Sequence, residues 1–174
     1  MPAWDILVRA SHWAVAGLVM FDWIRDDGDR LHRLMGYGAV GIILARWLWA
    51  ATPWSRGGLA ALVPSPGATL QYTRELLRGR APRHIRHDPL GLWMVWLLWS
   101  LVILLGITGW LSRLDAFWGD ERVQQVHAWL ADGLMVAVAM HLIGVASMSR
   151  YWRENLAVAM ITGRKRGLGE TDEG

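Results

Sequence analysis

Four long apolar segments alternate with charged connections along this chain. The third is the clearest, because 22 residues from Leu90 to Leu111 include no charged side chain. That length is enough to cross a hydrocarbon core about 30 Å thick. Asp88 and Pro89 precede it. Aspartate is a good N-cap residue, and proline is the residue best tolerated at the first helical position. The pattern predicts an all-α protein whose helices span a membrane.

The other three apolar segments contain few charged residues. Arg9 and Asp22 lie near the two ends of the first, Arg46 lies near the end of the second, and Asp132 is the one acid in the apolar part of the fourth. A signal peptide begins with a basic region and ends at a small-residue cleavage site, whereas this segment follows the acidic Asp5 and no such cleavage site comes after it. We therefore expect the first segment to be a retained helix rather than a signal peptide. The expected spans are about 6–24, 31–51, 90–111 and 123–148, in one membrane domain over residues 1–166.

The distribution of basic residues predicts the orientation of this four-helix bundle. Two regions are rich in Arg and Lys, the long middle connection and the C-terminal segment, whereas the other two connections mix a few Arg residues with acids. The positive-inside rule places both basic regions, and with them both termini, in the cytoplasm. The basic residues are Arg56, Arg74, Arg78, Arg80, Arg83 and Arg86 in the connection, and Arg150, Arg153, Arg164, Lys165 and Arg166 near the C-terminus.

Composition agrees with a membrane protein and excludes every site that depends on cysteine. Hydrophobic residues make up 53% of the 174 positions, and 13 residues are Trp, more apolar surface than a soluble domain of this size could bury. The net charge of +3 comes from Arg residues beside apolar segments, so it reflects topology rather than nucleic-acid binding. Cysteine is absent, which excludes disulfides, iron–sulfur clusters, zinc–thiolate sites and covalent c-type haem attachment.

Two regions outside the spans have distinct patterns. Between the second and third spans, residues 67–78 set Leu70, Leu76 and Leu77 against charged neighbours, and Gly79 follows. This spacing predicts a short amphipathic helix on the inner membrane surface, with an ordinary connector as the alternative. The last residues, 167–174, are rich in Gly and acids, and we expect them to be disordered.

Histidine is the residue type that suggests function. Four of the six, His12, His32, His127 and His141, fall in or at the edge of apolar spans, where ionisable residues are costly. His127 and His141 lie fourteen residues apart on one predicted helix, which puts them within about 40° of the same face and about 21 Å apart along its axis. One face of the fourth helix therefore offers an imidazole near each membrane surface.

Helix lengths place the four histidines at two depths. His12 and His141 lie eight and nine residues from the expected cytoplasmic ends of their helices, roughly 12 and 13 Å. His32 lies at the outer end of the second helix, and His127 is about 7 Å inside the outer end of the fourth. The arithmetic predicts two histidine pairs, one above the other across the membrane.

Two imidazoles at each level suit six-coordinate haem iron, to which the macrocycle supplies four more nitrogens. A structural zinc ion would need four protein ligands. Small residues near the histidines would leave room for a flat ring: Ala16, Gly17, Gly36 and Gly144. Arginines could pair with haem propionates, Arg9 and Arg46 at the inner level and Arg30 and Arg33 at the outer level.

Other interpretations of these residues stay open. A single membrane histidine is more often a packing residue or part of a proton path than a ligand, although four at two matched depths are harder to explain that way. His84 and His87 lie in the Arg-rich connection and are expected to be interfacial. Asp22 and Asp132 could be protonated, exposed to water or paired with Arg, and the sequence does not decide their roles.

Local motifs over almost the whole chain resemble those of the bacterial cytochrome b561 family, which includes the cytochrome b subunits of nickel–iron hydrogenases. The ending after Glu154 is closest to the short hydrogenase-type branch. The matching text comprises Trp4-Asp5, Val8-Arg9, Ser11-His12-Trp13, His32-Arg33, Gly36-Tyr37-Gly38, Arg46, Trp49, His87-Asp88-Pro89-Leu90-Gly91, Thr108-Gly109, His127, Leu130-Ala131, His141, Gly144-Val145, Glu154-Asn155-Leu156 and Ala159 to Arg166.

The resemblance implies a four-helix protein of the bacterial inner membrane with two b haems, each held by two histidines. The ligands would be His12 with His141 for the inner haem and His32 with His127 for the outer haem. Such proteins move electrons between the quinone pool and a redox partner. The sequence departs from the family at Ala128, where a Glu or similar residue usually follows the histidine, so the hydrogen bonding around the outer haem should differ here.

Three functions are consistent with these features. The first is a membrane cytochrome that serves a partner such as a hydrogenase or a c-type cytochrome. The second is a stand-alone quinone oxidoreductase acting on a small oxidant or reductant such as superoxide. The third is a non-redox scaffold in the lipid bilayer, in which the histidines only pack. The short outer connections leave little room for a second active site, which favours the first.

Overall fold

The computed structural model describes residues 5–25, 28–55, 58, 62–80, 82 and 88–164. This part of the chain is helical and contains no β-strand, as predicted for an all-α protein. A single 3₁₀ turn, Asp115–Phe117, interrupts the connection between the two longest helices. The α-helices are α1 (Ile6–Ile24), α2 (Arg30–Ala50), α3 (Pro66–Leu77), α4 (Pro89–Leu111), α5 (Glu121–Tyr151) and α6 (Leu156–Thr162).

Each of the four long helices begins at an aspartate whose side chain accepts a backbone N–H from the first turn. These N-caps are Asp5, Asp29, Asp88 and Asp120, and they satisfy donors that would otherwise be unpaired at a helix start. The helices lie within three residues of the expected apolar segments at every boundary. The sequence pattern therefore located them well, because charged caps and apolar runs coincide.

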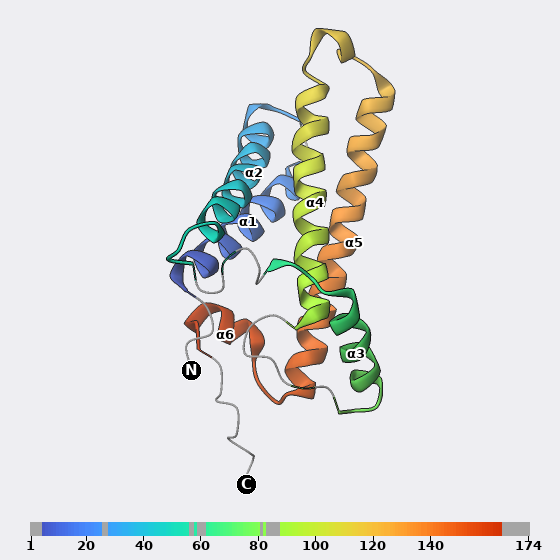
Figure 1. The fold of residues 1–174 in the computed structure, drawn as a ribbon. Coiled ribbons are helices and arrows are strands. Elements are labelled where there is room, and N and C mark those ends of the chain that lie inside the picture. The colour runs from blue at the N-terminus through green and yellow to red at the C-terminus, as the bar shows by residue number, and fades with distance from the viewer. Residues whose placement is uncertain are drawn as a thin grey trace.

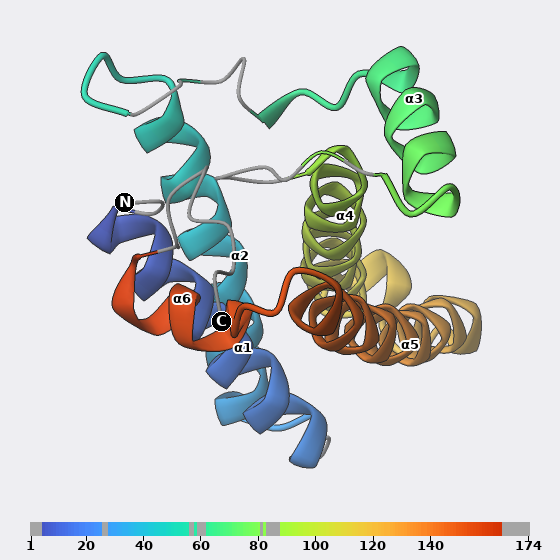
Figure 2. The same ribbon diagram turned by 90° about the horizontal axis from the view of Figure 1, so that it is seen from below.

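The helix α6 was not expected. Asn155 caps its start by accepting the N–H of Val158, and Gly163 ends it with a left-handed backbone, φ 75°. Both signals stand in the sequence, but seven residues are too few for a hydropathy pass to detect. In Figure 2, α6 continues from the end of α5 towards α1. There Arg9 Nη1 donates to the carbonyl oxygen of Thr162 at 3.0 Å, which links α1 to α6.

The bundle consists of two helix pairs. Figures 1 and 2 show α1 beside α2 and α4 beside α5, and packing between α2 and α4 joins the pairs. The core at this junction is formed by Ala39, Ile43, Val102 and Leu134. Close approach is possible because Gly106 of α4 has no side chain: a Cβ there would lie 2.7 Å from Val40 Cγ2 of α2.

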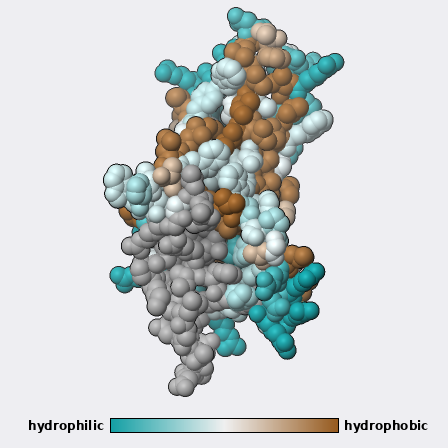
Figure 3. Space-filling view, in the orientation of Figure 1, coloured by the Kyte–Doolittle hydropathy of each residue, from teal (hydrophilic) through white to brown (hydrophobic). Residues whose placement is uncertain are grey.

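The outer surface of the bundle suits lipid. Large apolar side chains are exposed along the helices, including Leu48 (72% exposed), Trp129 (65%) and Ile143 (66%). Figure 3 shows hydrophobic residues along the middle of the molecule and hydrophilic ones gathered towards its ends. Exposed apolar surface on this scale marks a membrane or partner interface. Within the described residues, α4 and α5 are long and apolar enough to cross a membrane.

The connection between α2 and α4 contains the predicted short helix, with residues 66–77 in place of 67–78. Two tryptophans of α4 anchor this region: Trp93 Nε1 donates to Thr69 Oγ1 at 3.1 Å, and Trp96 Nε1 donates to the carbonyl oxygen of Leu62 at 2.6 Å. Leu70 and Leu77 are exposed, as a membrane-facing surface would require. The roles expected for His84, His87 and the 167–174 tail fall outside the described residues.

Replacing Gly106 with Ala should destabilise the junction between α2 and α4. The added methyl group would meet the stiff β-branched side chain of Val40, and overpacking of this kind costs about 1–3 kcal/mol. The expected result is a lower midpoint of thermal unfolding in detergent. Gly41→Ala is the matched control, because its Cβ would meet nothing within 4 Å. Equal midpoints for the two variants would contradict this packing.

Tyr72 should titrate outside the usual range of tyrosine. Its side chain is buried on α3, and burial, with smaller contributions from Asp88 and Tyr151, raises its pKa to about 12. An unfolded chain ionises tyrosine near pH 10, so folding stability should fall as the pH rises from about 10 to 12. Tyrosinate absorbance should show a transition near pH 12 that Tyr72→Phe abolishes. Its persistence in that variant would assign it to another residue.

Candidate functional site

The four membrane histidines lie in two facing pairs. The ring centroids of His12 on α1 and His141 on α5 are 6.3 Å apart, with an angle of 54° between the ring planes. Those of His32 on α2 and His127 on α5 are 6.2 Å apart, with an angle of 69°. The helix α5 thus contributes one ring to each pair, and its two histidines lie about 21 Å apart along the axis.

These separations are those that a shared metal ion requires. A metal–imidazole bond is about 2.0–2.1 Å and the ring centre lies about 1.1 Å beyond the bonded nitrogen, so two imidazoles on opposite sides of one ion have centroids about 6.3 Å apart. Direct stacking would bring the rings closer, and a direct hydrogen bond between them leaves no room for an ion. Both pairs therefore fit the axial positions of haem iron, whose four other ligands come from the macrocycle.

In the outer pair, an oxygen atom lies close to each Nδ1. Asp22 Oδ1 lies 3.0 Å from His32 Nδ1, and Thr108 Oγ1 lies 2.8 Å from His127 Nδ1. The Thr108 hydroxyl already donates to the carbonyl oxygen of Leu104 at 2.9 Å, so it accepts from His127. A carboxylate likewise only accepts. The His127 ring is therefore assigned a proton on Nδ1, which leaves its Nε2 free to bind a metal, and a proton on His32 Nδ1 would face the Asp22 carboxylate in the same way.

Glycines bring these partners close to the outer pair. A Cβ on Gly109 would lie 3.4 Å from His127 Cε1, and one on Gly36 would lie 3.4 Å from Asp22 Oδ2. Gly36 was predicted to make room for a flat ring, and in the structure it lies against the Asp22 carboxyl. By contrast, a Cβ added at Gly17 or Gly144 would have no neighbouring atom within 4 Å, so both positions leave open space beside α1 and α5.

Several buried nitrogens in the inner half of the described bundle have no hydrogen-bond partner. Among the described residues, His12 Nδ1, Arg9 Nε and Arg46 Nη1 are buried without a hydrogen-bond partner. Arg46 lies within electrostatic range of Asp5 at the start of α1, so Arg9 and Arg46 share the inner level. Buried unpaired donors are rare in folded proteins. Carboxylates such as haem propionates would satisfy them, as the sequence analysis proposed for both arginines.

The outer arginines have other surroundings. Arg33 Nη1 donates to the carbonyl oxygen of Gly28 at 3.1 Å, and Arg30 is exposed at the first residue of α2. A nearby arginine, Arg25, lies 3.7 Å from the Asp29 carboxylate. No hydrogen bond between the described residues joins Arg30 or Arg33 to the outer histidine pair.

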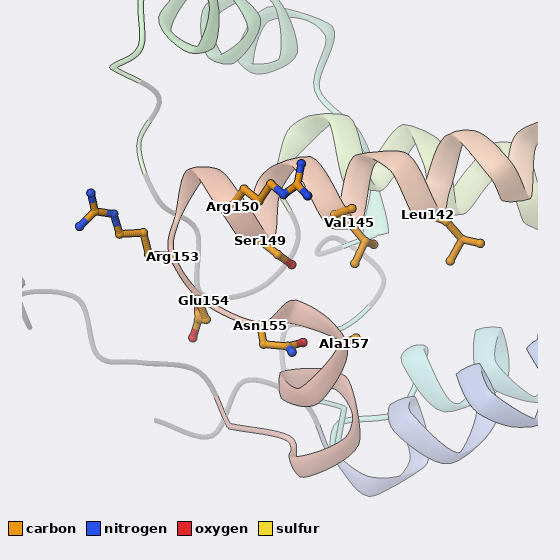
Figure 4. A pocket seen from close by; sticks show the side chains of 9 residues that line it. Leu142, Val145, Ser149, Arg150, Arg153, Glu154, Asn155 and Ala157 are labelled. Carbon is orange, nitrogen blue, oxygen red and sulfur yellow. The ribbon is translucent and has the colours of Figure 1, made fainter.

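A pocket of about 420 Å³ lies beside the inner level, between the end of α5 and α6. Leu142, Val145, Ala146 and Ala157 form its apolar wall, while Ser149, Arg150, Arg153, Glu154 and Asn155 line the rest (Figure 4). Ser149 Oγ accepts the backbone N–H of Leu156 at 3.2 Å, which fixes the start of α6. Val145 follows His141 by one helical turn, so the pocket begins close to the inner pair.

Sequence reasoning missed two residues of this site. Asp22 was recognised as a charge within a span, but its role was left open, and Thr108 was only part of a motif. A signal for Asp22 was its place near the outer end of the first helix, at the level of His32. Thr108 gave no comparable signal, because its contact with His127 depends on how α4 packs against α5.

Comparison with known proteins agrees with the geometry. A sequence model described as prokaryotic cytochrome b561 matches residues 3–163. No curated protein and no solved structure matches the chain. Members of the matched family are helical membrane proteins that bind b-type haem and transfer electrons. The match covers nearly all of the sequence, and the chain belongs to the prokaryotic cytochrome b561 family.

Proposed function

We propose that the protein transfers electrons across the bacterial inner membrane through two b-type haems. His12 and His141 would hold the inner haem, and His32 and His127 the outer one. The observation that carries this proposal is the separation of 6.3 and 6.2 Å between facing rings at both levels. Packed tryptophan rings of the same bundle have similar separations, so it is the membership of a haem-binding family that weighs against the scaffold interpretation.

The residues around each pair have defined roles in this proposal. Bound haem would supply a one-electron iron couple, and the four imidazoles would hold the iron, with hydrogen bonds to their other nitrogens setting ring orientation. Arg9 and Arg46 would pair with propionates at the inner level. The apolar helices exclude water from both pairs, which keeps the surroundings of the metal fixed and of low polarity.

We further propose that α1, α2, α4 and α5 all cross the bilayer, with both termini in the cytoplasm. The four helices have 19, 21, 23 and 31 residues, lengths that suit a hydrocarbon core of about 30 Å. Figure 1 shows α3 and α6 at one end of the bundle. Basic residues gather around these two helices: Arg74, Arg78, Arg150, Arg153 and Arg164. The positive-inside rule makes this end cytoplasmic.

Quinone is the proposed small-molecule partner, and the pocket between α5 and α6 is its proposed site. The volume of about 420 Å³ is in the range of ligand pockets, and its apolar wall with a few polar side chains suits a quinone. The second partner would be a redox protein such as a hydrogenase or a c-type cytochrome. A stand-alone quinone oxidoreductase acting on superoxide is the alternative, and purification with or without a partner separates the two.

Removing one ligand from each pair should remove one haem. His12→Ala is expected to lose the inner haem and His127→Ala the outer haem, because an axial position is lost in each case. Haem content per protein, measured by extraction and by the reduced spectrum, should fall from two to one in both variants with different spectra remaining. Two haems retained in both variants would show that these histidines are not the ligands.

Filling the pocket should slow exchange with quinone and leave haem binding intact. Ala146→Trp places a large ring in the pocket, so the rate at which a quinol analogue reduces the protein is expected to fall at least tenfold. Ala139→Trp is the matched control, since Ala139 is exposed elsewhere on α5. An unchanged rate in Ala146→Trp, at full haem content, would place the quinone site elsewhere.

A further inference from the structure

The two histidine pairs differ in what their Nδ1 atoms contact. In the outer pair, His32 faces the carboxylate of Asp22 at 3.0 Å and His127 faces the hydroxyl of Thr108 at 2.8 Å. Neither His12 Nδ1 nor His32 Nδ1 meets the geometry of a hydrogen bond among the described residues, but His32 has a carboxylate oxygen close by and His12 does not. A charged acceptor forms a stronger hydrogen bond than a neutral one. Among the described residues, His32 is the only one of the four rings with a carboxylate within 4 Å of a ring nitrogen, so it alone has a charged acceptor within reach.

The fold holds this carboxylate in place. The side chains of His32 and Asp22 are only 23% and 17% exposed, so water competes weakly for the contact. Gly36 follows His32 by one turn of α2 and lies on the same face, and its missing side chain gives the Asp22 carboxyl room between α1 and α2. A larger residue at Gly36 would push the carboxyl away from its present position.

Neighbouring cations do not take the carboxylate away from His32. Arg25 lies close to Asp29 at 3.7 Å, and Arg33 donates to the carbonyl oxygen of Gly28. The ion-pair contact of Asp22 is with the imidazole of His32. The geometry is that of a carboxylate–histidine–metal arrangement, in which the carboxylate fixes ring orientation and makes the imidazole a more basic ligand.

We propose that Asp22 is a positioning residue that lowers the reduction potential of the outer haem. This inference rests on the proposed function. A more basic imidazole stabilises ferric over ferrous iron, since second-shell hydrogen bonding is one of the means by which a protein sets a haem potential. The inner pair lacks an equivalent carboxylate contact among the described residues. The offset would favour electron movement from the outer level to the inner level.

The test is a potentiometric titration of the purified holoprotein in which both haems are followed by their reduced spectra. Spectra of His12→Ala and His127→Ala assign each midpoint to a level. Asp22→Asn keeps the size of the side chain but removes its charge. We expect the outer midpoint to rise by an amount equal to about a tenfold change in the ferric-to-ferrous preference, about 59 mV for one electron. The inner midpoint should stay the same.

Three further variants make this test specific. Asp22→Glu retains a carboxylate and should restore most of the lower potential. Gly36→Val keeps Asp22 but adds methyl groups beyond a Cβ position that already lies 3.4 Å from its carboxyl, so it should displace the carboxyl and raise the outer midpoint by a smaller amount. This variant also tests the inference if Asp22→Asn loses the outer haem. Asp132→Asn is the matched control, since it neutralises another acid within a helix, exposed on α5, and should change neither midpoint.

A second readout separates a change at the ligand from a general loss of structure. The electron paramagnetic resonance signal of the oxidised outer haem should shift in Asp22→Asn, while that of the inner haem should not. Unchanged outer midpoints in both Asp22→Asn and Gly36→Val, or equal shifts of both haems, would overturn the inference. Failure of the proposed function is distinguishable, because the wild type itself would then contain fewer than two haems.

Discussion

The arrangement depends on the cost of placing imidazoles inside an apolar bundle. Histidine in a membrane helix is unfavourable unless its ring nitrogens find partners, and here four rings meet in two pairs at 6.3 and 6.2 Å. Those distances leave room for one ion in each pair. The helix α5 carries one member of each pair, so its straight course through the bundle sets the spacing between the two levels. The other two proposed ligands, His12 on α1 and His32 on α2, would be placed by how those helices face α5.

The rest of the bundle is consistent with this constraint. The two helix pairs touch mainly through α2 and α4, where Gly106 and the small core residue Ala39 permit close packing. α1 and α5 carry the facing histidines of the inner pair but do not pack closely along their lengths. Among the described residues, buried nitrogens without hydrogen-bond partners include those of His12, Arg9 and Arg46 in the inner half of the bundle and that of His32 in the outer half. An anionic cofactor would complete both the metal coordination and these unfulfilled hydrogen bonds.

Much of this could be predicted from the sequence, because it depends on local periodicity. Aspartate caps and apolar runs located the long helices, and counting residues from helix ends placed the histidines at two depths. What could not be predicted depends on tertiary packing. The contact of Thr108 with His127 requires the register of α4 against α5, and that of Asp22 with His32 requires the close approach of α1 at Gly36. The helix α6 was missed because it is too short to give a hydropathy signal.

The most direct measurement is electron paramagnetic resonance of the oxidised wild-type protein, with the spin concentration compared with that of the chain. Two imidazoles on each iron should give two low-spin ferric signals, each accounting for one haem per chain. A high-spin signal would mean that an axial position is not held by histidine. A single low-spin signal equal to one haem would contradict the account, since only one of the two facing pairs would then bind iron.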